Sequence, residues 1–125
     1  MSKRILVVED DHDILSLLKD VLENEGYEVT GLAYTDSILQ NINQYHPDLV
    51  MLDFLLPGVN GGELCHEIKS NVFTASLPVI MLSAFPRVLE SLGDFGADAF
   101  IAKPFDLTAM LQIVSGCFND NLAMA

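Results

Sequence analysis

The chain has 125 residues, of which 50% are hydrophobic and 19% are charged, and this composition excludes an intrinsically disordered segment. Its formal net charge is −12, from 18 acidic and 6 basic residues, so the chain repels nucleic-acid phosphates and we expect it to bind no DNA or RNA directly. At this length we expect one domain with a core of its own, spanning residues 1–125.

The first predicted element is a strand. Residues 5–8 form a continuous aliphatic run, which is typical of a strand buried on both faces.

This N-terminal run is too short for a signal peptide and far below the roughly 18 apolar residues of a membrane span. We therefore expect a cytoplasmic protein that does not contact a membrane.

Strands and helices then alternate along the chain. Apolar and β-branched runs predict further strands at residues 27–32, 49–52, 79–82 and 99–102. Apolar residues at helical spacing lie between the strands, in stripes that begin at Ile14, Ile38, Leu64 and Leu107. Such alternation with short turns predicts parallel strands, right-handed crossovers and helices on both faces of one sheet. The expected fold is therefore α/β, a doubly wound five-stranded parallel sheet.

The helical segments contain end signals and the two cysteines. Gly26 is placed to cap the end of the first helix, and Asp106 is placed to cap the start of the last. A further short helix is expected at residues 86–92, with a proline in its first turn. Cys65 and Cys117 fall within helical patterns and show no CxxC spacing, so we expect two reduced, partly buried thiols.

Polar side chains gather where four of the predicted strands end. The carboxyl ends of parallel strands meet at one edge of the sheet, and ligands of doubly wound folds bind outside that edge. An aspartate within an apolar strand is unusual, because aspartate is depleted in strands and rarely buried without a partner. In chain order the polar residues are Glu9, Asp10 and Asp11, then Asp53, then Ser83, and finally Lys103 with Pro104.

These residue types favour a cation and an anion at the same edge. Carboxylates that gather beside apolar segments repel one another and lose hydration, so a cation is needed to offset the cost. Magnesium is a hard ion that prefers oxygen ligands, and proteins often hold it with one or two carboxylates and a phosphate. Lys103 adds a compact positive charge that suits phosphate oxygens.

With these motifs in this order, the chain resembles the receiver domain of bacterial response regulators. The resemblance covers roughly residues 3–118 and leaves residues 119–125 as a tail or the start of a linker. It implies the flavodoxin-like strand order 2-1-3-4-5. The motifs that carry it are residues 5–10, residues 52–58 with Gly61, residues 81–84 and residues 100–105.

The resemblance implies a magnesium-dependent phosphoryl acceptor. Asp53 matches the family's nucleophile, which becomes an aspartyl-phosphate. Asp10 and Asp53 match the metal ligands, with the Leu55 backbone carbonyl as a further ligand and Glu9 acting through water.

The remaining motif residues match the phosphate-binding and switch positions of the family. Lys103 would neutralise charge on the phosphoryl oxygens, as phosphoryl transfer requires. Ser83 would hydrogen-bond the phosphoryl group after transfer, and Phe100 occupies the switch-aromatic position. Lys103 and Pro104 match the family's cis peptide bond.

The implied partners follow from the same resemblance. A sensor histidine kinase or a phosphotransfer protein would supply the phosphoryl group, and an output domain or effector protein would respond to it. The chain would not be an enzyme with a separate substrate, because it catalyses only its own phosphorylation and dephosphorylation. A homodimer would form through the face made by the expected helix at 86–92, the strand at 99–102 and the last helix.

Some positions differ from the common pattern of the family. Phe100 lacks the hydroxyl group of the usual tyrosine, so its ring cannot make an output hydrogen bond. Leu55 and Phe85, two residues past Asp53 and Ser83, are apolar where polar groups often position the attacking water. We therefore expect a long-lived phosphorylated state. The segment between Ser83 and Lys103 also leaves little room for a full fourth helix.

Three other interpretations compete with the receiver. A flavodoxin-like cofactor binder would need a cradle of glycine, serine and threonine after the first strand, where this chain has acidic residues. A degenerate receiver would bind proteins without taking phosphate, although the acidic pair, Asp53, Ser83 and Lys103 are all present. A hydrolase with an aspartyl nucleophile commonly has a second acid two residues later, where this chain has Leu55.

Overall fold

The computed structural model of the chain describes residues 2–84 and 96–124. Within them, five parallel strands form one sheet in the order β2-β1-β3-β6-β7. The strands are β1 (Arg4–Val8), β2 (Glu28–Leu32), β3 (Leu49–Asp53), β6 (Val79–Ser83) and β7 (Ala99–Ala102). Counted along the chain without the short hairpin described below, this is the order 2-1-3-4-5, so the predicted fold is confirmed.

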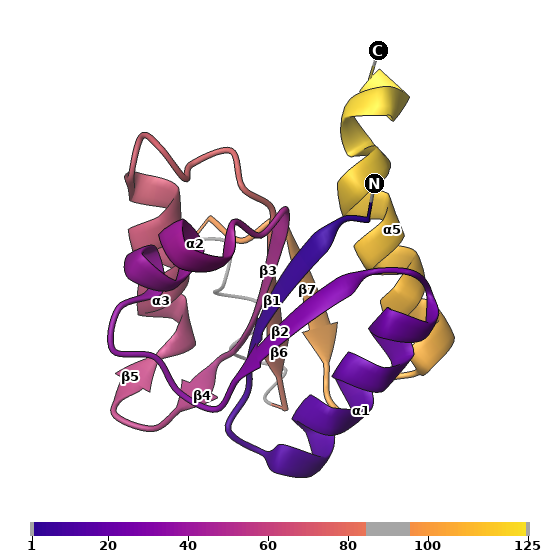
Figure 1. Cartoon of the computed structure of the whole chain (residues 1–125), viewed down its shortest axis with the longest axis horizontal. Helices are drawn as coiled ribbons and strands as arrows, with labels where there is room; N and C mark the ends of the chain where they lie inside the picture. Colours follow the sequence, from indigo (N-terminus) through magenta and orange to yellow (C-terminus); the bar gives the residue numbers. More distant parts are fainter. Residues whose placement is uncertain (1, 85–95, 125) are drawn as a thin grey trace.

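Helices cover both faces of the sheet. Figure 1 shows α1 and α5 on one side of the strands and α2 and α3 on the other. Two separate apolar clusters fill the two spaces between helices and sheet. The helices are α1 (His12–Asn24), α2 (Ile38–Tyr45), α3 (Gly61–Ser70) and α5 (Leu107–Met124).

The central strands are apolar on both faces because both faces are covered. In β1, Leu6 and Val8 pack with α2 and α3, whereas Ile5 and Val7 pack with α1 and α5. Every residue of β3 and β6 is buried, which explains the continuous apolar runs in their sequences. Asp53, the last residue of β3, is therefore a carboxylate at the edge of a layer of buried apolar side chains.

Capping residues lie at the ends of the first and last helices. Asp11 caps the start of α1, and Gly26 follows its end with a φ of 96°, a conformation that glycine adopts without steric cost. Helix α5 extends from Leu107 to Met124, and Asp106 before it accepts a hydrogen bond at Oδ1 from the Thr108 N–H at 3.4 Å. Phe85 and the short helix predicted at residues 86–92 lie outside the described residues.

Two further observations concern the helices. Cys65 in α3 is fully buried and Cys117 in α5 is partly buried, both as reduced thiols. Burial raises the pKa of the Cys65 thiol to about 11.

Among the described residues, we find no helix that combines the length and the apolar character needed to cross a membrane.

A short hairpin fixes the backbone after Asp53. Strands β4 (Leu55–Leu56) and β5 (Val59–Asn60) pair in antiparallel fashion across Pro57 and Gly58, and the φ of Gly58 is 75°. The Gly61 N–H donates to the Phe54 carbonyl at 2.8 Å. A Cβ atom on Gly61 would lie 2.2 Å from the Asp53 carbonyl oxygen, so the close approach requires glycine.

We predict that Gly61→Ala destabilises the chain. Its methyl group would meet backbone rather than a flexible side chain, so the hairpin must shift, at a cost of roughly 1–3 kcal/mol in the free energy of unfolding. Urea denaturation at equilibrium measures the change. Gly116→Ala is the matched control, because a Cβ atom added there would have nothing within 4 Å, and we expect a gain of up to about 1 kcal/mol in α5. Equal stability of the two variants would contradict this account of the hairpin.

Candidate functional site

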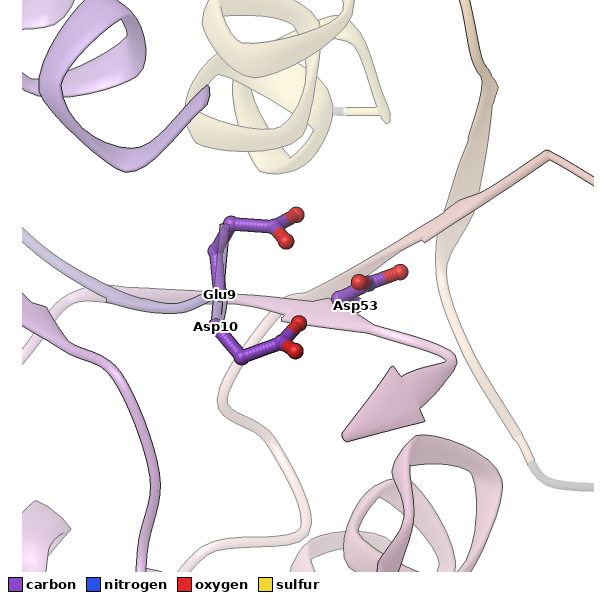
Figure 2. Close-up of side chains that lie close together, drawn as sticks. All are labelled: Glu9, Asp10 and Asp53. Carbon is purple, nitrogen blue, oxygen red and sulfur yellow. The ribbon is translucent and has the colours of Figure 1, made fainter. Parts of the chain in front are cut away.

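The carboxyl ends of the strands bring three acidic side chains together. Glu9 and Asp10 follow β1, and Asp53 ends the neighbouring strand β3. One carboxylate oxygen from each lies within 4.8 Å of the others. Figure 2 shows the three carboxylates directed to the same side of the backbone. The arrangement concentrates oxygen ligands at the edge of the sheet where the sequence predicted them.

The three acids differ in exposure. Glu9 is 0% exposed and Asp53 is 6% exposed, whereas Asp10 is exposed to solvent. Buried carboxylates lose hydration and need compensation from charges or hydrogen bonds. Asp10 therefore forms the solvent-exposed side of the cluster.

Lys103 supplies the compensating charge from the loop after β7. Its Nζ lies 2.7 Å from Glu9 Oε2 and 3.2 Å from Asp53 Oδ2. The backbone N–H of Lys103 donates to the Ser83 carbonyl at 2.8 Å, which ties this loop to the end of β6. The peptide bond between Lys103 and Pro104 is cis.

The ionisation of Glu9 and Lys103 reflects this burial and pairing. Burial raises the pKa of Glu9 to about 7, against the opposing effect of its hydrogen bonds from Lys103 and from the Asp11 backbone. Burial alone would lower the pKa of Lys103, but its hydrogen bond to Glu9 and the charge of Asp53 raise it overall. Lys103 is therefore held as a cation between two carboxyl groups.

Asp11 belongs to the helix rather than to the acidic cluster. Its Oδ1 accepts hydrogen bonds from the N–H groups of Asp13 at 2.9 Å and Ile14 at 3.2 Å. These bonds satisfy two backbone donors at the start of α1. Asp11 therefore begins the helix.

The remaining predicted residues lie around the cluster. Ser83 is buried at the end of β6, one residue beyond Leu82, which pairs with Asp53 across the sheet. Phe100 in β7 is partly buried and packs against the apolar cluster on the side of α2 and α3. The side chain of Leu55 is 55% exposed, two residues past Asp53.

The donor set fits a hard divalent cation. Three carboxylates within reach of one point, one of them open to solvent, match the preference of Mg²⁺ for a few protein oxygens together with water. Both carboxylate oxygens of Glu9 already accept protein hydrogen bonds, one from Lys103 and one from the Asp11 N–H at 3.1 Å. Asp10 and Asp53 are therefore better placed than Glu9 to bind an ion directly.

Sequence reasoning missed two features of this site. Lys103 was expected to meet phosphate, but its direct pairing with Glu9 was not anticipated, because the two residues are 94 positions apart. Asn60 was also missed: its side chain accepts from the N–H groups of Gly62 and Glu63 and so caps α3 beside the hairpin. An asparagine followed by two glycines before an apolar helical stripe is the signal that could have revealed it.

Comparison with known proteins agrees with this geometry. A family model described as the response regulator receiver domain matches residues 5–115. The DNA-binding dual master transcriptional regulator RpaA of Synechocystis is 37% identical over 113 residues, covering 89% of this chain and 47% of that protein. The phosphate regulon transcriptional regulatory protein PhoB of Rhizobium meliloti is 37% identical over 116 residues, covering 91% and 51%.

A solved structure extends the comparison to three dimensions. The crystal structure of a putative response regulator from Chloroflexus aurantiacus superposes with a TM-score of 0.88 at 31% identity, covering 94% of this chain and 98% of that chain. The chain belongs to the response regulator receiver domain family. It spans about half the length of the curated relatives it matches. Receiver domains of two-component systems act as phosphoacceptors and use Mg²⁺ at an acidic pocket, and this chain has an acidic cluster of Glu9, Asp10 and Asp53.

We predict that Mg²⁺ stabilises the folded chain through Asp10. At ten times its dissociation constant, an ion that binds only the folded state adds about 1.4 kcal/mol, or roughly 5 °C in Tm. Thermal unfolding is measured in MgCl₂ and in NaCl of equal ionic strength. The difference between the two Tm values is the stabilisation that is specific to Mg²⁺. Asp10→Ala should remove this difference.

Asp11→Ala is the matched control for this prediction. It should cost about 1 kcal/mol through the lost helix cap and still keep the full Mg²⁺ shift. A Mg²⁺ shift that is lost in both variants, or in neither, would reassign the ligands.

Proposed function

We propose that Asp53 accepts a phosphoryl group in the presence of Mg²⁺ and that this event switches the conformation of the domain. The observation that carries the proposal is the setting of the Asp53 carboxylate. It is 6% exposed, lies within reach of two other acids, and has the Lys103 ammonium at 3.2 Å. Lys103 compensates the charge of the Asp53 carboxylate, and a phosphoryl donor would approach from the side of the exposed Asp10.

The reaction would proceed at a carboxylate oxygen of Asp53. That oxygen forms a bond to the phosphorus atom of the donor, while the bond from phosphorus to the donor's leaving group breaks and the leaving group keeps the electron pair. Lys103 Nζ already lies beside the Asp53 carboxylate and would neutralise charge on the phosphoryl oxygens. When bound, the metal would supply further positive charge at the same place.

We assign direct metal binding to Asp10, to Asp53 and to the backbone carbonyl of Leu55. Glu9 would act through water, because its two oxygens are engaged by Lys103 and by the Asp11 N–H. The hairpin supports the Leu55 assignment, since its hydrogen bonds fix the backbone that follows Asp53.

We assign the switch to Ser83 and Phe100. Ser83 is buried beside the acceptor strand, and its carbonyl holds the loop of Lys103. A hydrogen bond from its hydroxyl group to the phosphoryl group would draw this strand end inward. Phe100 lies on the neighbouring strand, and Met81 pairs with it across the sheet. The ring would move into the space that this shift opens.

The partners are proposed from the family. A sensor histidine kinase or a phosphotransfer protein would donate the phosphoryl group, and an output domain or effector would respond. Relatives such as RpaA are DNA-binding regulators, but the net charge of −12 makes direct nucleic-acid binding by this segment unfavourable. The proposed homodimer face includes residues 86–92, outside the described part of the chain, and stays a prediction.

Phosphorylation and dephosphorylation of its own Asp53 would be the only reactions that the domain catalyses.

We predict that Asp53→Asn abolishes phosphorylation. Incubation of the wild type with Mg²⁺ and acetyl phosphate should add one phosphoryl mass in intact-protein mass spectrometry, because a carboxylate is the required nucleophile. Asp48→Asn is the matched control, because Asp48 precedes β3 at the other end of the strand and should be labelled as the wild type. Equal labelling of Asp53→Asn would refute the assignment, and a wild type that takes no phosphate would support a degenerate receiver instead.

We also predict that the phosphorylated state is long-lived, because apolar side chains follow the acceptor. Leu55 is 55% exposed beside Asp53 and offers no hydrogen bond to orient an attacking water. The double variant Leu55→Asn with Phe85→Glu should lose its phosphoryl group about tenfold faster, equivalent to roughly 1.4 kcal/mol of barrier. A slow decay has two possible causes: the bulk of Leu55 excludes water, or the side chain offers no hydrogen bond to orient water. Leu55→Ala separates them, since it removes bulk without adding a hydrogen-bonding group. An unchanged or slower decay in the double variant would contradict the prediction.

A further inference from the structure

The loop between α3 and β6 presents two adjacent apolar side chains to solvent. Val72 is 84% exposed and Phe73 is 92% exposed, the highest values among the large apolar side chains that the structure describes. In Figure 1 this loop lies at the top of the sheet, whereas β4, β5 and the start of α1 lie at the bottom. The two side chains are therefore at the opposite end of the domain from Asp53.

Hydrogen bonds hold the loop in this conformation. The Phe73 N–H donates to Asn71 Oδ1 at 2.9 Å, and the Thr74 hydroxyl donates to the Ile68 carbonyl at 2.6 Å. Lys69 Nζ donates to the Leu77 carbonyl at 2.6 Å and pairs with Asp98 at 2.7 Å. These contacts connect the loop to the end of α3 and to Asp98 in the conformation that exposes Phe73 to solvent.

A hollow of about 610 Å³ opens beside Phe73. Its apolar walls come from α2 and from the segments that precede β3 and β6, and the same hollow is edged by polar groups. This volume lies in the range of sites that take small molecules or a few side chains of a partner. Its apolar lining residues are Leu39, Ile42, Pro47, Phe73, Leu77 and Pro78.

The hollow continues into an acidic region. His46 and Asp48 line both it and a second hollow of about 390 Å³, which Arg4 and Glu28 also line. This second hollow therefore has one arginine against two carboxylates. Arg4 pairs with Glu28 at 3.2 Å and offsets its charge, so Asp48, whose Oδ2 accepts the Arg4 backbone N–H at 2.8 Å, carries the remaining negative charge of this hollow. The composite surface is apolar at the Phe73 end and acidic at the Asp48 end.

Charge decides what kind of partner fits this surface. The chain carries a net charge of −12, and three of its described cations, Arg4, Lys69 and Lys103, are already in ion pairs. A second copy that met this surface with the same surface of its own would place like charges opposite each other. A segment that combines an aromatic side chain with a nearby basic one matches both ends of the surface.

We propose that this surface, made by α2, the loop of Phe73 and the residues before β3, binds an aromatic and basic peptide segment of another protein. The aromatic side chain packs on Phe73 within the larger hollow, and the basic side chain pairs with Asp48. Because the length of the sheet separates this surface from Asp53, binding does not depend on phosphorylation.

The test uses capped synthetic peptides in a matched set that pairs either tryptophan or serine with either arginine or glutamate. Backbone-amide NMR of the whole chain locates binding, and titration gives the affinity. The peptide with tryptophan and arginine should shift the amides of residues 38–48 and 71–78. Phe73→Ser should weaken this binding by about tenfold or more, as expected for an aromatic anchor at the centre of a contact.

Control variants separate this surface from the phosphoacceptor end. Tyr34→Ser removes another exposed aromatic side chain, from the loop after β2, and should bind the peptide as the wild type does. Asp53→Asn should also bind normally, so a failure of the proposed phosphorylation leaves this result interpretable. The proposal is overturned if none of the peptides binds, if the shifts centre on Asp53, or if Phe73→Ser binds unchanged. A dimer in sedimentation that Phe73→Ser dissociates would overturn it in favour of a second copy.

Discussion

The Lys103 ammonium lies between two buried carboxyl groups, and the phosphoacceptor end of the domain depends on this contact. Glu9 and Asp53 come from neighbouring strands, and their charges would repel without the cation at 2.7 and 3.2 Å. The same residue holds the end of β6 through its backbone N–H. One residue therefore joins three strand ends, two through its side chain and one through its backbone. In the proposed function, a phosphoryl group on Asp53 would act on these bonds, and a local charge change would thereby reach the edge of the sheet.

The fold was predictable because its signals are local. Apolar runs such as residues 49–52 and 79–82 identify strands covered on both faces, and the alternation with helical stripes gives the parallel topology. The acidic cluster was predictable for a related reason, since the carboxyl ends of parallel strands meet at one edge. The pairing of Glu9 with Lys103 was not, because it depends on how the loop after β7 turns, and no local pattern records that geometry.

The two ends of the sheet differ in what they display. The end with Asp53 is acidic and holds its charges partly buried, whereas the end with Phe73 displays apolar groups on a loop with satisfied hydrogen bonds. An exposed aromatic side chain was invisible in the sequence, because Val72 and Phe73 follow an apolar helical stripe and resemble its continuation. The helix ends at Ser70 instead, and the turn at Asn71 directs both side chains outward.

The contact between Gly61 and the Asp53 carbonyl limits how this chain can evolve. Every missense change at codon 61 adds at least a Cβ atom, and that atom would lie 2.2 Å from the carbonyl oxygen. Any substitution there must therefore move the hairpin and lower the stability of the domain. A second change that accommodates the moved backbone would recover this stability, so we expect position 61 to vary together with its neighbours.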